Sequence, residues 1–187
     1  MKPLSKRSLI IIVAVTAFVA ATVTVVWAFM YKSTETYDND FVAAQVSCQV
    51  VESYSDNVKT SVKVKNTSNI PAYLRLRVVS YWQDTKGNVV QMASEMPSFS
   101  VDTAKWIDMG NYTYCYKSPV NPEELTEELF ASGSTITLTK KTTTVNDVVY
   151  EYEQVVEIIA EAIQSEPASA VESWGVVVGY DGKLALS

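Results

Sequence analysis

The chain of 187 residues contains no histidine. Histidine is the commonest zinc ligand and the commonest general base. Its absence therefore excludes zinc peptidase motifs of the H-E-x-x-H type and the Ser-His-Asp and Cys-His catalytic arrangements. The sequence also lacks a G-x-S-x-G motif, a glycine-rich phosphate loop and paired cysteines at metal-binding spacing. We predict no catalytic residue, no metal site, no cofactor and no enzymatic activity.

Cysteine is scarce, and two residues, Cys48 and Cys115, do not make a disulfide framework. Outside the cell they could pair, and closing the loop of 66 residues between them would stabilise the fold by roughly 4 kcal/mol in the chain-entropy model. Alternatively, they are two small buried thiols on separate strands. The sequence leaves both interpretations open.

Charge is missing from residues 9–31, a run that follows Lys2, Lys6 and Arg7. At about 1.5 Å per residue, a helix of this length is roughly 35 Å long, enough to cross a hydrocarbon core of about 30 Å. The basic residues before the run place the N-terminus in the cytoplasm and the rest of the chain outside. We therefore predict that residues 1–31 are a signal peptide or membrane anchor and that the remainder is extracellular or on the cell surface.

Cleavage and retention of this leader both have support. A cleaved signal peptide usually has a shorter apolar core of about 7 to 15 residues, so the length favours a retained single-pass anchor through residues 9–31. Val26-Trp27-Ala28, in contrast, offers small residues at the two positions that a signal peptidase inspects. The sequence does not decide between them.

The part of the chain after the leader has 12 basic and 21 acidic residues, a formal charge of −9. Such a charge argues against nucleic acid as a partner. It keeps an exported protein soluble and is compatible with cation-mediated contact to a polyanionic wall.

Short segments rich in Val, Tyr, Thr and Ile predict an all-β domain at residues 41–187, joined to the leader by a polar linker at 32–40. Residues 72–83 show the alternation of a half-buried strand, with Leu74, Leu76, Val78 and Trp82 on one side. Many short strands without long helices indicate an antiparallel, jelly-roll-like β-sandwich. The predicted strands are 41–52, 58–66, 72–83, 89–92, 105–109, 112–117, 134–141, 149–164 and 176–178.

Three further segments carry helical or ambiguous signals. Asn121 could cap a helical turn inside residues 118–130, with Pro122 in its first position. Residues 149–164 fit either period, but their glutamates all share odd parity and would repel one another on a helix, which favours a strand. A short helical stretch at 167–173 should end at Gly175.

Three stretches behind the basic and apolar leader resemble the TasA/camelysin-like exported proteins of Gram-positive bacteria, which have a SipW-type signal peptide. They are VKVKNTSNIPAYLRLRV (62–78), SPVNPEELTEELF (118–130) and AEAIQSEPASAVESWG (160–175). The resemblance covers most of the exported part and implies a jelly-roll β-sandwich. It also implies a structural role at the cell surface or in the biofilm matrix, with self-association or other surface proteins as partners.

In that family, a strand near the mature N-terminus completes the sheet of the next subunit. Carried to this chain, the resemblance implies a donor strand at residues 37–46, with Tyr37, Phe41, Val42 and Val46 as its candidate contact residues. Strand addition works because main-chain hydrogen bonds reward an unpaired edge. A leader that stays attached would tether this strand close to the bilayer.

The alternative function is a membrane-tethered binding module for wall or matrix polysaccharide. Tyr112, Tyr114 and Tyr116 alternate within one predicted strand, and an exposed aromatic face could stack on sugar rings. Such a stripe is more often sandwich core or a cross-strand ladder. The two functions differ in whether this tyrosine face is exposed and whether residues 37–46 join copies of the chain.

Overall fold

The computed structural model describes residues 6, 15–17, 20, 22 and 43–187. Those before residue 43 are helical. Among the described residues, no helix has the length and apolar character needed to cross a lipid bilayer. Most of residues 9–31 lie outside the described positions, so the predicted signal peptide or anchor stays a prediction. Ala43–Ser187 is a compact unit, described below by itself.

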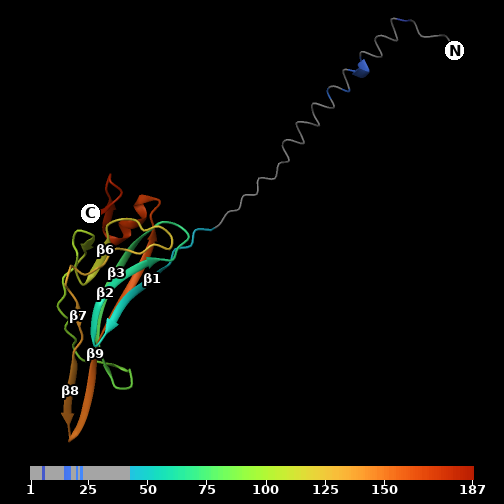
Figure 1. The fold of residues 1–187 in the computed structure, drawn as a ribbon. Coiled ribbons are helices and arrows are strands. Elements are labelled where there is room, and N and C mark those ends of the chain that lie inside the picture. Colours follow the sequence, from blue (N-terminus) through green and yellow to red (C-terminus); the bar gives the residue numbers. More distant parts are fainter. Residues whose placement is uncertain (1–5, 7–14, 18–19, 21, 23–42) are drawn as a thin grey trace, which may run out of the picture. The chain divides into compact units, whose positions relative to one another are not determined.

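Ala43–Ser187 is an all-β sandwich of antiparallel strands, which confirms the predicted fold class (Figure 1). One layer has the strand order β1-β2-β7, and the other has the order β5-β6-β3-β9-β8 with β4 added to β3. The finer prediction of jelly-roll connectivity stays a prediction. The strands are β1 (Cys48–Ser55), β2 (Val58–Asn66), β3 (Ala72–Asp84), β4 (Val89–Val90), β5 (Trp106–Asp108), β6 (Thr113–Tyr116), β7 (Ile136–Thr137), β8 (Lys140–Val145), β9 (Val148–Gln164), β10 (Val176–Val178) and β11 (Leu184–Leu186).

The core lies between the two layers and follows the alternation of β3. Leu74, Leu76 and Val78 are buried on its inner face and pack with Val62 and Val64 of the smaller sheet. Trp82 is also buried. The predicted pattern of this strand is therefore confirmed, because one face meets the opposing layer and the other does not.

The ambiguous segment at 149–164 is a strand, as the parity of its glutamates predicted. β9 pairs with β3 without a register shift from Tyr152 to Gln164, so residues opposite one another share a face of the sheet. Val156 thereby faces the core, and Glu157 and Glu161 stand on the outer face in solvent.

A second, smaller core covers one end of the outer face of the larger sheet. The 3₁₀ helix η1 (Ala168–Trp174) ends at Gly175, whose φ of 76° is the left-handed conformation that glycine adopts without strain. Val171 of this helix packs with Tyr73 and Cys115 of the sheet. The predicted helical stretch and its glycine terminus are confirmed, and the C-terminal segment closes over the sheet.

The predicted strand 134–141 is wrong in one respect, because the chain changes sheets within it. β7 pairs with β2 in the smaller sheet, whereas β8 pairs with β9 in the larger one. The change occurs at Leu138, whose N–H donates to the Asn57 carbonyl at 2.7 Å, and at Thr139, whose carbonyl accepts from Gln154 at 2.9 Å. One extended segment therefore ties the two layers together.

The helical turn predicted at Asn121 is also wrong. Glu123 has a φ of 65°, and its N–H donates to the Asn66 carbonyl at 2.8 Å. Further along, the Thr126 N–H donates to the Val64 carbonyl, and the Leu129 N–H donates to the Val62 carbonyl. The segment makes a β-turn at Pro122-Glu123 and then runs along β2, because its backbone satisfies the open edge of that strand, which a helical turn could not do.

Candidate functional site

The tyrosine face of the alternative function is not available to a ligand. Tyr114 is only 5% exposed, and Tyr116 packs against the same core, with its ring 5.1 Å from that of Trp106. Tyr112 precedes β6, has a φ of 56° and is exposed. The prediction of a shared exposed face is therefore wrong, because the first tyrosine lies in a turn and the others complete the core.

The two cysteines are both free and lie in different sheets. Cys48 is half-buried on β1, and Cys115 is buried on β6 in the second core. Burial raises the pKa of the Cys48 thiol and raises that of Cys115 to about 11. The predicted disulfide is therefore absent from this structure, which shows the alternative of two thiols on separate strands. Both thiols stay protonated and poorly reactive near neutral pH.

Of the candidate donor strand, Tyr37, Phe41 and Val42 lie outside the described residues. Val46 is exposed and precedes β1, which begins at Cys48 rather than at the predicted residue 41. The residues beside it are held by the turn after β2: the N–H of Gln45 donates to Asn69 Oδ1 at 2.8 Å, and the N–H of Ser47 donates to Ser68 Oγ at 2.9 Å. The end of the candidate donor is therefore anchored to its own sandwich.

The larger sheet has a long open edge on β9. β8 pairs with β9 only as far as Glu153, and β9 continues to Gln164 with β3 on its other side. The backbone N–H of Gln154 donates to the Thr139 carbonyl, on the β8 side of β9. Because backbone groups alternate along a strand, the even-numbered residues that follow direct theirs to the open side. Among the described residues, no strand pairs with β9 there, although β1 of the other sheet lies beside it (Figure 1).

A second open edge belongs to the arm, by which we mean residues 140–152 of β8, its turn and the start of β9. Figure 1 shows this hairpin running past the rest of the sandwich. Its turn, Asn146-Asp147, has φ values of 51° and 59°, as in the type I′ turns that favour tight hairpins. Four of its apolar side chains are exposed: Val145 (51%), Val148 (51%), Val149 (59%) and Tyr150 (45%).

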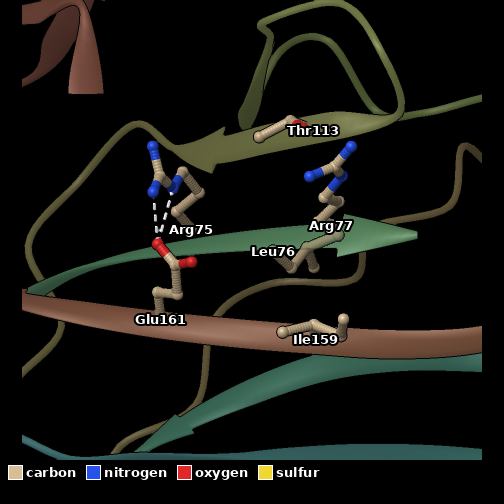
Figure 2. A pocket seen from close by; sticks show the side chains of 6 residues that line it. All are labelled: Arg75, Leu76, Arg77, Thr113, Ile159 and Glu161. Carbon is tan, nitrogen blue, oxygen red and sulfur yellow. Dashed lines mark hydrogen bonds and ion pairs between the residues drawn. The ribbon is translucent and has the colours of Figure 1, made fainter. Parts of the chain in front are cut away.

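A small hollow of about 150 Å³ lies on the outer face of the larger sheet, between β6, β3 and β9 (Figure 2). Arg75 donates to Glu161 from Nε at 3.0 Å and also from its terminal nitrogen, and its guanidinium stacks 4.6 Å from the Trp174 ring centroid. Arg77 has no ion-pair partner among the described residues. Glu157 and Glu161 lie on the same face of the sheet, so the formal charges of the two arginines are matched by two carboxylates.

Sequence analysis proposed the donor segment, but it missed both open edges. The arm carried a signal in TVNDVVY (144–150), where apolar residues flank a two-residue turn on both faces instead of one. The open edge of β9 has no such signal in the sequence, because it depends on the residue at which β8 begins to pair with β9. Within the described ranges, no group of three or more acidic or cysteine side chains is placed to hold a metal ion.

Comparison of the chain with protein-family models, with curated proteins and with solved structures finds no match. The resemblance to the TasA/camelysin-like proteins therefore stays a prediction.

Proposed function

We propose that the chain is an exported structural protein of the cell surface or extracellular matrix, and that its copies join by addition of a β-strand. Residues 37–46 are the donor, and the edge of β9 from Val155 to Gln164 is the acceptor. The observation that carries this proposal is the open edge itself, which has ten residues, as does the donor segment.

The acceptor edge has the properties that strand addition needs. The backbone groups of its even-numbered residues point away from β3, and an added strand gains main-chain hydrogen bonds whatever its side chains are. Val156, Ile158, Ala160 and Ala162 line its inner side and belong to or pack against the core, so apolar donor residues would be buried there. β1 lies beside this edge without pairing, so moving it aside breaks side-chain contacts and no β1–β9 strand pairing.

The donor segment is apolar where contact with the core is expected. Phe41 and Val42 follow the acidic residues Asp38 and Asp40, so the segment changes from polar to apolar along its length. The anchored residues Gln45 and Ser47 fix its C-terminal end on its own sandwich. A donor held at one end by its own copy and paired at the other with a neighbour would produce a linear, head-to-tail assembly.

Electron microscopy of the purified chain tests this proposal. The wild-type protein should form filaments, and the Phe41→Asp, Val42→Asp double variant should lose them, because charged side chains cannot enter the core of the neighbour. The Ser33→Asp, Thr34→Asp variant adds the same charge outside the donor and should retain them. A wild-type chain that forms no filaments, or a donor variant that forms them as well as the wild type, would contradict the proposal.

The acceptor side is tested by Ala160→Pro. The N–H of Ala160 points to the open side, so proline removes a donor of the edge without removing a hydrogen bond to β3. We expect a β-rich circular dichroism spectrum like that of the wild type and a loss of filaments. The N-terminal mass of the native protein from cells would show, in addition, whether residues 1–31 are removed.

A further inference from the structure

The arm presents a strand edge in which residues 142–145 lack the features that usually protect one. β8 pairs with β9 on one side only, and the alternation set by Thr139 directs the backbone groups of Lys140, Thr142 and Thr144 outward. The edge from Thr142 to Val145 has no charge, no proline and no bulge. A two-stranded hairpin with exposed apolar side chains is marginal in water by itself, and an exposed edge of this kind pairs readily with another strand.

We propose that the β8 edges of two copies of this chain pair antiparallel about a two-fold axis, which joins their larger sheets into one continuous sheet. This contact does not depend on strand donation, because it uses neither residues 37–46 nor the acceptor edge of β9. It is an isologous interface, in which one patch meets itself.

The charges along β8 favour a second copy as the occupant. Lys140 and Lys141 begin the strand, and Asp147 lies in the turn, two residues after its last residue, Val145. Antiparallel pairing brings the basic end of one copy to the acidic turn of the other, whereas parallel pairing would place lysine against lysine. Lys141 is available for this, because its ammonium contacts only Met92 Sδ, at 3.6 Å, and no carboxylate among the described residues.

The alternation and the charges together favour one register. With the two-fold axis at Thr143, Thr142 pairs with Thr144 of the other copy through hydrogen bonds, and Lys140 lies opposite Asn146, beside Asp147. Threonine pairs of this kind are favourable across strands. Val145 lies opposite Lys141 of the other copy, on the inner face, where the lysine stem covers apolar surface that is exposed in one copy.

Disulfide trapping in the full chain tests the register. Thr143→Cys places two thiols in a non-hydrogen-bonded pair, with Cα atoms about 4.5 Å apart, within the range of a disulfide. Oxidised glutathione should convert the two thiols to an interchain disulfide and release two reduced glutathiones, giving a dimer on a non-reducing gel. Thr142→Cys is the matched control: its Cα atoms would be more than about 7 Å apart in this register, so it should give no more dimer than the wild type.

Charge at position 145 tests the contact in the Thr143→Cys background. Val145→Lys faces Lys141 of the other copy and should lower the yield of dimer about tenfold or more, because like charges oppose each other. Val145→Glu places a carboxylate opposite the same lysine and should leave the yield of dimer unchanged. Both substitutions are at an exposed position, so the circular dichroism spectrum should not change.

Several outcomes would overturn the two-fold contact: no trapped Thr143→Cys dimer, equal trapping at residues 142 and 143, or equal yields for Val145→Lys and Val145→Glu. The Phe41→Asp, Val42→Asp variant separates this test from the previous one. It should lose filaments and still give the trapped dimer, so the two proposals fail independently.

Discussion

The two halves of β9 have the same alternation and very different surroundings. In the C-terminal half, Val156 is buried against the core, whereas in the N-terminal half, Val148 on the same face of the strand is 51% exposed. The difference lies in the opposing layer, since the smaller sheet ends before the arm begins (Figure 1). The alternation of a strand therefore predicts which face can be buried. Whether that face is buried depends on the presence of an opposing layer.

The largest expected effect comes from a matched pair of substitutions in the two halves. Val156→Ala removes buried methyl groups and should lower the free energy of unfolding by about 2–3 kcal/mol. Val148→Ala, on the same face eight residues earlier, should change it by less than about 0.5 kcal/mol. Urea denaturation followed by circular dichroism measures both. Equal losses would mean that the arm is covered in solution.

Gln154 stands at the boundary between the halves, and its substitution is expected to have the next largest effect. Its Nε2 donates to the Glu95 carbonyl at 2.7 Å, and its Oε1 accepts from the Thr139 hydroxyl at 2.9 Å. Gln154→Leu leaves these partners without the bonds and should cost about 1–2 kcal/mol in the same denaturation experiment. Gln164, at the half-buried end of the strand, has no such network within the described part of the chain, so Gln164→Leu serves as the control. A loss no larger than that of the control would show that water replaces the network.

The third comparison is between a tyrosine of the core and one of the arm. Burial raises the pKa of Tyr114 to about 12, from an ordinary value of about 10. Between these values the unfolded chain releases the proton and the folded chain keeps it, so stability falls as pH rises from 10 to 12. Tyr114→Phe should reduce this fall and change little at pH 7, and Tyr150→Phe, at an exposed position of the arm, is the matched control for the loss of a hydroxyl group. Denaturation at a series of pH values measures the slopes, and a slope unaffected by Tyr114→Phe would contradict the assignment.

The smallest effect is expected on the outer face, where two arginines on β3 have different surroundings. Arg75→Ala removes the pair with Glu161 and the contact with Trp174, and should cost no more than about 1 kcal/mol because the site is partly exposed. Arg77→Ala removes an arginine without an ion pair among the described residues, so its effect should be smaller still. A difference of zero between the two would show that the ion pair in Figure 2 contributes nothing to stability.

The sequence predicted what depends on local pattern and missed what depends on neighbours. The alternation around Leu76 and the parity of Glu157 and Glu161 gave the correct faces of β3 and β9, because a side chain's face is fixed by its own strand. The helical turn predicted at Asn121 was wrong because that segment pairs with the edge of β2. This pairing cannot be predicted from the residues of the segment itself. Tyr114 could not be assigned to core or surface for the same reason.

The candidate site was predictable only in part. Strand patterns predicted a sandwich, and the resemblance to a family of exported proteins implied residues 37–46 as a donor, but an acceptor edge is an absence of pairing and leaves no residue signature. The open edge of β9 exists because the chain stays with the smaller sheet as far as Leu138 and joins the larger one only at Thr139. Such a crossing looks like one continuous strand in the sequence.

That crossing also bears on how the molecule would respond to mechanical tension. A pull on the turn at Asn146 travels along β8 through Thr139 to Ile136, which is fully buried between the layers. The same pull along β9 loads its continuous pairing with β3 lengthwise, so the bonds must slide together instead of opening one after another. A domain pulled from this end should therefore resist extension more strongly than one in which the hydrogen bonds break singly.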